Sequence, residues 1–290
     1  MEKKIVLVTG ASSGIGQETA KLMARQGYIV YGTSRLANFE KTSYTMIPMT
    51  LEDEGSVGAA VKHVAQAHGR IDVLVNAAGS GIAGAVEETS AEEAKAQFDV
   101  CLFGALSVQS AVLPYMRAQG SGMIINIGSM ASCFPVPFQG MYSAVKAALF
   151  MMSATLAMEL KPFGIKVCVV EPGDTKTGFT DKREYTKRTA KTAYNPYFER
   201  ALYEMIRSEL NAYGPQKCAK MVLKTAEQKN PPIRKSVGIG YKTLYAASKL
   251  LPWRAKMAVI KMIYLIKDPP SGAVWTFDKQ FGKAANQQKD

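Results

Sequence analysis

The chain is poor in the residues that mark several common classes of protein. Its 290 residues include only two His, two Trp and four Cys. The cysteines, Cys101, Cys133, Cys168 and Cys218, have neither the paired spacing of a zinc site nor the density of a disulfide scaffold. We therefore expect no metal site and a reducing, cytoplasmic location.

Long apolar runs are also scarce. The first residues, MEKK, run directly into IVLVTG, without the apolar segment and cleavage site of a secretory leader. The apolar stretch 257–266 is too short to cross a bilayer and is interrupted by Lys261. A chain that is 47% hydrophobic can still bury one large core, so residues 1–290 are expected to form a single domain.

Acidic residues are few in one late segment. Residues 181–267 contain 19 Lys or Arg against 6 Asp or Glu, a formal +13, whereas the whole chain carries +12. Nucleic acid, an anionic membrane surface, an anionic substrate and a solvated face are each compatible with such a segment. Because no nucleic-acid docking motif accompanies the charge, we expect no nucleic-acid partner. An anionic membrane surface, an anionic substrate and a solvated face stay open, and packing of this segment against a second subunit is the alternative to contact with a membrane.

Short apolar runs alternate with helical patterns as far as Pro172. Strands are expected at residues 4–10, 28–33, 43–49, 71–79, 122–129 and 164–173. Helices are expected at about 14–26, 54–67 and 91–117, and from about 140 to 162. This pattern predicts an α/β fold, a Rossmann-type doubly wound parallel sheet of about seven strands, which binds ligands at the carboxyl ends of its strands.

Beyond Pro172 the alternation stops. Residues 174–235 are predicted to be a helical substrate-cap insertion, rich in Lys, Arg, Tyr and Met. A last short strand is expected at VGIGY, residues 237–241, and residues 241–290 are expected to be a variable C-terminal extension. Both parts are too short to fold without the sheet, so the helical C-terminal cap is treated as part of the same domain.

The first predicted strand ends in the glycine-rich sequence TGASSGIG. Gly10, Gly14 and Gly16, with Ile15 between the last two, stand where a strand turns into a helix. Glycine lets a backbone approach a pyrophosphate closely, and the exposed N–H groups of the following helix favour negative charge. The turn is therefore predicted to bind a dinucleotide.

Residues at the end of the second predicted strand indicate whether NAD or NADP binds. No acidic residue, which would bind the ribose 2′-OH of NAD, occurs from Gly27 to Asn38. Arg35 stands there instead, and Ser12 can donate to a 2′-phosphate from the glycine loop. NADP is therefore predicted in preference to NAD.

Tyr142 and Lys146 lie four residues apart in GMYSAVKAALF, so they share one face of a helix. Together with TGASSGIG, NAAG at Asn76–Gly79, Ser129 thirteen residues before Tyr142, and EPG at 171–173, this pattern resembles the short-chain dehydrogenase/reductase family. Within the family it looks most similar to the 17β-hydroxysteroid-dehydrogenase-like reductases.

The resemblance implies a role for each matching residue. Tyr142 would be the general acid in ketone reduction, Lys146 would favour its phenolate and hold the nicotinamide ribose, and Ser129 would bind the substrate carbonyl. The other positions implied to contact the cofactor are Asn76, Gly79, Pro172, Gly173, Thr175 and Thr177. Asn76 also suits a purely structural role as a hydrogen-bonding residue at a strand end.

Two positions depart from the family pattern. Cys101, in FDVCLFG, stands where the family has an Asn that anchors a proton-relay water, and a thiol is a weak hydrogen-bond partner. Thr50 stands where the family has its adenine-binding Asp, and Asp53 is not a substitute merely because it is near. No motif places a His beside Cys101, as a cysteine nucleophile would require.

The function implied is that of an NADP(H)-dependent oxidoreductase interconverting a secondary alcohol and a ketone, on a lipophilic substrate that is steroid-like or carries an acyl chain. A homodimer or tetramer is expected with it. The alternative, suggested by Cys101 and Thr50, is a non-catalytic dinucleotide-binding sensor or scaffold.

Overall fold

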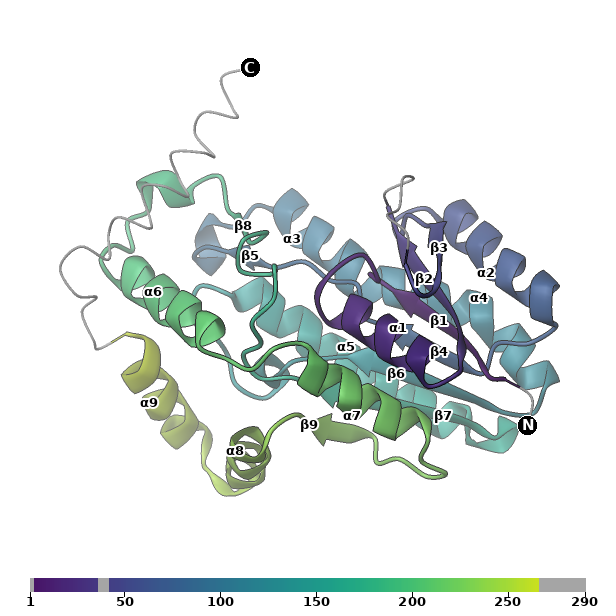
Figure 1. Ribbon diagram of the computed structural model, residues 1–290. Coiled ribbons are helices and arrows are strands. Elements are labelled where there is room, and N and C mark those ends of the chain that lie inside the picture. The colour runs from purple at the N-terminus through teal and green to yellow at the C-terminus, as the bar shows by residue number, and fades with distance from the viewer. Residues whose placement is uncertain (1–2, 36–41, 266–290) are drawn as a thin grey trace, which may run out of the picture.

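The computed structural model describes residues 3–35 and 42–265, and its centre is a parallel sheet (Figure 1). The order of the seven strands is β3-β2-β1-β4-β6-β7-β9. Their bounds are β1 Ile5–Thr9, β2 Ile29–Ser34, β3 Thr45–Pro48, β4 Val73–Asn76, β6 Gly122–Ile127, β7 Ile165–Glu171 and β9 Arg234–Ser236. The direction of winding reverses between β1 and β4, where doubly wound sheets bind ligands. The predicted fold class is confirmed.

Helices cover both faces of the sheet. The helices of the described residues are α1 Gly14–Arg25, α2 Glu54–His68, α3 Ala91–Phe98, α4 Gly104–Ala118, α5 Gly140–Glu159, α6 Tyr197–Leu210, α7 Gln216–Ala226, α8 Ile239–Leu250 and α9 Trp253–Tyr264. Short helical turns lie at η1 Val86–Glu88, η2 Asp99–Phe103, η3 Met130–Ser132, η4 Lys161–Phe163 and η5 Thr189–Lys191. A small separate pair of strands is made by β5 Ile82–Ala83 and β8 Glu184–Tyr185.

Two apolar layers hold the helices on the sheet. On one face, residues such as Met23 of α1 and Val222 of α7 pack against Val6 and Ile125. On the other, α2 and α4 pack against the alternate side chains of the same strands, for example Leu7 and Ile124. The strands are apolar on both faces because both faces are covered.

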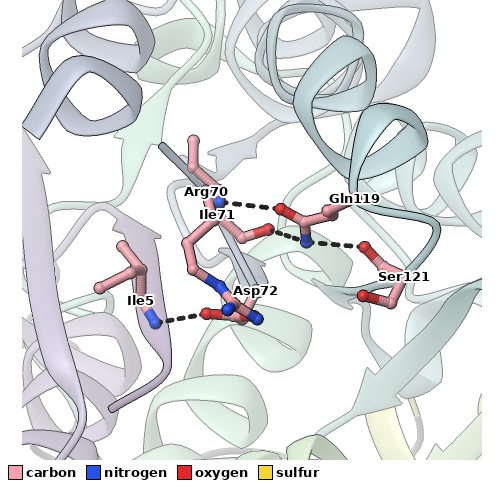
Figure 2. Close-up of polar contacts among 6 residues, drawn as sticks. All are labelled: Ile5, Arg70, Ile71, Asp72, Gln119 and Ser121. Carbon is pink, nitrogen blue, oxygen red and sulfur yellow. Dashed lines mark hydrogen bonds and ion pairs between the residues drawn. The ribbon is translucent and has the colours of Figure 1, made fainter. Parts of the chain in front are cut away.

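A polar network fixes the amino ends of the central strands (Figure 2). The Asp72 carboxylate accepts from the backbone N–H of Ile5 at 2.7 Å and pairs with Arg70. The side-chain amide of Gln119 accepts from Ile71 N–H and donates to the carbonyls of Ile71 and Ser121. These bonds align β1, β4 and the start of β6 at the end of the sheet opposite the predicted site.

The structure differs from the sequence prediction in one helix. The helix predicted at 91–117 is interrupted by the π-helical turn η2, which contains Cys101, between α3 and α4. A π turn adds a residue to the helix and re-aims the side chains around it, and such turns are frequent at functional sites. The turn directs Cys101 into the interior, where it is 2% exposed.

The strand predicted at 237–241 is wrong, because helix α8 begins at Ile239. The last strand is instead β9, Arg234–Ser236, whose sequence is polar. Arg234 is tolerated there because its Nε lies 3.1 Å from the buried Glu171 carboxylate and its guanidinium lies 3.5 Å from the Phe150 ring centroid. Burial raises the pKa of Glu171, while Ser132 and Arg234 act in the opposite direction.

The segment 174–235 contains two kinds of structure. Helix α7 belongs to the layer on the sheet, and α6 forms a separate core with Phe198 and Met205, against which Phe138 and Tyr264 pack. Figure 1 shows α6, α8 and α9 together at one end of the molecule, away from the N terminus. The limits of the cap, 174–235, stay a prediction, and residues 266–290 of the predicted extension lie outside the described residues.

Two segments, Ala91–Ala118 and Gly140–Glu159, are long and apolar enough to cross a membrane by length and composition. Both also supply core residues, such as Val112 and Leu149, to the fold described above. Core helices of a folded domain pass the same test, so this is weak evidence for a membrane span.

Candidate active site

Ser129 lies just beyond the carboxyl end of β6. It is the N-cap of η3, and its Oγ accepts a hydrogen bond from Ala131 N–H at 3.1 Å. An accepting hydroxyl keeps its proton for donation to another group. Ser129 lines the cavity described below, so a ligand carbonyl there can receive that proton.

Tyr142 and Lys146 lie on one face of α5, as their spacing predicts. Lys146 is 6% exposed, and its Nζ donates to the carbonyl of Ile127, at the end of β6, at 2.9 Å. The same Nζ lies 5.7 Å from the centroid of the Tyr142 ring, whose other neighbour is Phe179 at 5.8 Å between centroids. The ammonium is therefore anchored beside the phenol.

One cavity of about 850 Å³ joins these side chains to the predicted cofactor loops. Nine predicted site residues line it: Ile15, Gly79, Ser129, Tyr142, Lys146, Pro172, Gly173, Thr175 and Thr177. The other predicted residues, Gly10, Ser12, Gly14, Gly16, Arg35 and Asn76, are not part of its lining. The catalytic and nicotinamide-side predictions thus converge on one space, whereas the phosphate-side predictions lie outside it.

The glycine turn has the close packing that a dinucleotide loop requires. Gly10 has a φ of +66°, and a Cβ there would lie 2.7 Å from the Cα of Ala78. A Cβ on Gly16 would lie 2.4 Å from the carbonyl oxygen of Gly10. Helix α1 begins at Gly14. The side chain of its N-cap residue, Ser13, makes no capping hydrogen bond, and the first turn has no acidic residue. Its N–H groups are therefore suited to bind a phosphate.

The residues predicted to bind the 2′-phosphate lie at the exposed edge of this turn. Ala11 N–H donates to the carbonyl of Thr33 at 2.9 Å, which ties the loop to the end of β2. Ser12 follows Ala11, and Arg35 lies two residues after Thr33; both residues are exposed. Both side chains are therefore open to solvent beside the turn that is predicted to bind the dinucleotide.

Asn76 holds the strands together. Its Nδ2 donates to the Oδ1 of Asn126 at 2.9 Å, and Asn126 in turn donates to Ser153 Oγ at 2.8 Å. Asn76 is 5% exposed. These bonds link β4, β6 and α5, which supports the structural role considered from the sequence.

The loop after β7 closes the nicotinamide side. Thr175 Oγ1 donates to the carbonyl of Gly173 at 3.0 Å, and Thr177 lies against the glycine turn, 3.6 Å from where a Gly14 Cβ would be. The Tyr241 ring packs on Gly173, whose Cβ would lie 2.0 Å from the ring. The glycine at 173 is thus needed for this contact.

The two departures from the family pattern have local explanations. Cys101 Sγ accepts from Ser80 N–H at 3.4 Å and from Gln97 Nε2 at 3.2 Å. The amide of Gln97 also binds the backbone of Ser80 and Ile82, so it supplies the polar contacts next to the thiol. Asp53 caps α2 through Gly55 and Ser56 N–H, which accounts for its presence near Thr50.

Three further cavity residues, Gln139, Asp174 and Tyr241, belong to no motif in the sequence. Gln139 is 5% exposed, and its Nε2 has no hydrogen-bond partner among the described residues. The Asp174 carboxylate accepts from the hydroxyls of Tyr241 and Ser208, and its backbone N–H donates to Tyr241. Burial and the Asp174 charge raise the pKa of Tyr241 to about 12, so its phenol stays protonated and keeps donating. Only their proximity to Tyr142 and Gly173 in the chain could have indicated Gln139 and Asp174.

The residues around the cavity fit a nicotinamide dinucleotide. The glycine turn, the start of α1 and the threonines beyond Gly173 are the residues that would hold the dinucleotide. Across residues 3–35 and 42–265, no group of three or more His, Cys, Asp and Glu is arranged to bind a metal ion. His68 hydrogen-bonds to Tyr31 at 2.9 Å, in a different part of the fold from Cys101.

Comparison with known proteins finds relatives that match most of this chain. A family model described as short chain dehydrogenase matches residues 4–188. A 3-ketodihydrosphingosine reductase of Bacteroides thetaiotaomicron is 41% identical over 269 residues, which is 92% of this chain and 100% of the relative. Human 17-beta-hydroxysteroid dehydrogenase type 1 is 29% identical over 255 residues, 81% of this chain and 77% of the relative.

Solved structures share the fold over most of the chain. A short-chain dehydrogenase from Streptomyces avermitilis has a TM-score of 0.76 at 30% identity, over 90% of this chain and 98% of that one. ElxO with NADP bound has a TM-score of 0.70 at 25% identity, over 83% and 100%. A short chain dehydrogenase/reductase from Burkholderia phymatum in complex with NAD has a TM-score of 0.72 at 21% identity, over 93% and 98%.

Proposed function

Because this chain belongs to the short-chain dehydrogenase family, we propose that it is an NADP(H)-dependent oxidoreductase. It reduces the ketone of an acyl-chain substrate to a secondary alcohol and also catalyses the reverse oxidation. The observation that carries the proposal is the convergence of Ser129, Tyr142 and Lys146 on one cavity. A non-catalytic sensor, the alternative considered from the sequence, would have no need to keep all three side chains there.

The protein's own groups supply the proton and the charge stabilisation. The Ser129 hydroxyl donates to the substrate carbonyl, and the Tyr142 phenol gives its proton to the alkoxide that develops. Lys146, held by the Ile127 carbonyl, stabilises the phenolate that remains. When bound, the nicotinamide dinucleotide supplies the hydride in reduction and accepts it in oxidation.

NADP(H) is the proposed cofactor in preference to NAD. The support is the exposed Arg35 at the end of β2, the exposed Ser12 in the glycine turn, and the lack of any acidic residue from Gly27 to Asn38. A carboxylate in that interval would bind a 2′-OH and repel a 2′-phosphate.

The apolar wall of the cavity supports a lipophilic substrate. Side chains from several elements contribute to it: Met130, Phe134, Val136, Phe179, Met205, Leu244, Ile260 and Ile263. Apolar walls with few polar groups are typical of sites for lipophilic molecules. The 41% identical relative is named a 3-ketodihydrosphingosine reductase, which directs the proposal to an acyl chain rather than a steroid.

The charges of the cavity further support a substrate with an amino group. Three carboxylates line it, and two are neutralised by arginine: Glu204 by Arg207 at 2.6 Å and Glu209 by Arg183. No Lys, Arg or His of the described ranges pairs with Asp174, which accepts only from hydroxyls. A partly enclosed carboxylate without a cation favours a cationic ligand group. We therefore propose a long-chain 2-amino-3-ketone as the substrate class.

A homodimer or tetramer and a cytoplasmic location complete the proposal. Apolar side chains on the outer faces of η2, α4 and α5 are exposed: Phe103, Leu106, Met151 and Met158. Exposed large apolar side chains of this kind favour subunit contact.

Steady-state NADPH oxidation tests the function. The wild-type enzyme should reduce 3-ketodihydrosphingosine with a higher kcat/KM than a steroid ketone, and NADPH should serve better than NADH. A protein that binds NADPH but turns over no ketone of either class would favour the sensor alternative.

A further inference from the structure

Helices α8 and α9 meet at a corner whose apolar side chains point to solvent. Leu250 is 87% exposed and Trp253 is 61% exposed, and they are joined by Leu251 and Pro252, which are also exposed. Leu, Trp and Pro side chains are usually at least partly covered when they are contiguous, because exposing them to water is unfavourable. The corner therefore indicates a partner with an apolar phase.

The charge around the corner is of one sign. From Ile239 to Tyr264 there are five basic residues and no acidic one: Lys242, Lys249, Arg254, Lys256 and Lys261. Lys249 and Arg254 immediately flank the corner and are exposed. Lys256 Nζ lies 5.6 Å from the Trp253 ring, so cationic and aromatic groups are presented together. The partner is expected to be anionic as well as apolar.

The inner sides of the same helices form part of the cavity wall. Leu244 of α8 and Ile260, Ile263 and Tyr264 of α9 line the cavity that contains Tyr142. Ile260 is 8% exposed and packs with Met130 and Phe134, next to Ser129. The same two helices thus carry both the corner and part of the cavity wall.

An anionic bilayer satisfies all three observations. Trp is favoured at the membrane interface, Leu in the outer acyl region, and Lys or Arg beside acidic headgroups. A nucleic acid would leave the exposed leucines in water. A second copy of this chain in an isologous contact would set the five cations against the same five cations.

We propose that the corner Leu250–Trp253, with the flanking basic residues of α8 and α9, docks this protein peripherally on an anionic phospholipid surface. The α8–α9 wall then faces the acyl phase, from which a long-chain ketone enters the cavity. Docking stands on the surface alone, whereas the route for the ketone rests on the function proposed above.

Flotation with vesicles tests the docking without substrate or cofactor. The full-length protein should float with vesicles of phosphatidylcholine and phosphatidylglycerol at low salt, less at high salt, and little with phosphatidylcholine alone. The variant Leu250→Ser/Trp253→Ser should bind at least about 10-fold more weakly, since each side chain loses its burial in the acyl region. The charge variant Lys249→Glu/Arg254→Glu should lose the dependence on acidic lipid.

The matched control is Lys161→Glu/Phe163→Ser. It also changes an exposed cation and an exposed apolar residue, but at the start of β7, at the opposite end of the sheet. Its vesicle binding should equal that of wild type. In a Trp275→Phe background, which leaves Trp253 as the single Trp, emission should shift to the blue on anionic vesicles only.

Three results would overturn the docking proposal. The first is that the wild-type protein does not bind anionic vesicles at low salt. The second is that the control and corner variants lose vesicle binding equally. The third is that the corner variant changes the mass of the protein in solution, measured by light scattering, but not its vesicle binding. The last result would assign the corner to a second copy of the chain. NADPH turnover on a short, water-soluble ketone reports the proposed function separately, because that assay needs no membrane.

Discussion

Asp174→Asn should lower kcat/KM for ketones that carry an amino group and leave it unchanged for ketones that lack one. The substitution removes the negative charge of Asp174, which pairs with no cation among the described residues, but leaves an oxygen that accepts from Tyr241 and Ser208. The side chain keeps its size and its hydrogen bonds, so the free energy of unfolding should change by less than about 1 kcal/mol. What is lost is the attraction for a substrate ammonium.

The size of that attraction follows from where Asp174 lies. Two unit charges 4 Å apart at an effective dielectric constant of about 20 attract by roughly 4 kcal/mol. Asp174 is only half-buried, so water reduces this value, and about 1.5–3 kcal/mol, as for hydrogen bonds to charged groups, is the expected loss. That loss corresponds to a fall of about 10- to 150-fold in kcat/KM.

The assay compares NADPH oxidation with 3-ketodihydrosphingosine and with the same long-chain ketone lacking the amino group. Only the first ketone should show the fall. Glu204→Gln is the matched control, because Glu204 lines the same cavity but is already paired with Arg207. Its effect should be the same for both ketones. An equal fall for both ketones in Asp174→Asn, or no fall, would refute the assignment of Asp174 to the amino group.

Two further substitutions test the proposed phosphate contact of Arg35 and the role of Cys101. Arg35→Asp should raise the Kd for NADPH far more than that for NADH, because a carboxylate repels a 2′-phosphate and accepts from a 2′-OH; an unchanged ratio of the two Kd values would show that Arg35 does not contact the phosphate. Cys101→Asn should lower stability by about 1–3 kcal/mol, seen as a lower Tm, because the larger amide enters a site that is 2% exposed. Cys101→Ser, which is nearly the same size, should keep the wild-type Tm more closely, and a higher turnover of Cys101→Asn at unchanged Tm would show that the thiol limits proton relay.

The sheet was predictable because its strands are apolar on both faces and are separated by turns and helices. The pair Tyr142 and Lys146 was predictable for an equally local reason, since four residues bring two side chains onto one helical face. The glycine turn likewise carries its geometry in its residue types, and Gly10 and Gly16 pack too closely for a side chain.

The features that were missed depend on contacts between distant residues. Strand β9 is polar in sequence, and Arg234 lies in it because Glu171 and Phe150 meet it there. The π turn at Asp99–Phe103 has no distinctive composition, and it forms where Cys101 and Gln97 meet the backbone of Ser80. Asp174 follows Gly173 without a motif. It stands out because, among the described residues, arginines pair with the cavity carboxylates Glu204 and Glu209 but not with Asp174.

The proposed function depends most on Tyr142 as the proton donor to a bound ketone. Tyr142→Phe removes only the hydroxyl and keeps the ring between Lys146 and Phe179. The most direct test therefore measures NADPH affinity by fluorescence and turnover of 3-ketodihydrosphingosine on the same preparation. If Tyr142 donates the proton, the variant should have an NADPH Kd close to that of wild type and a kcat lower by at least about 10²-fold. A kcat near that of wild type with Kd unchanged would contradict it.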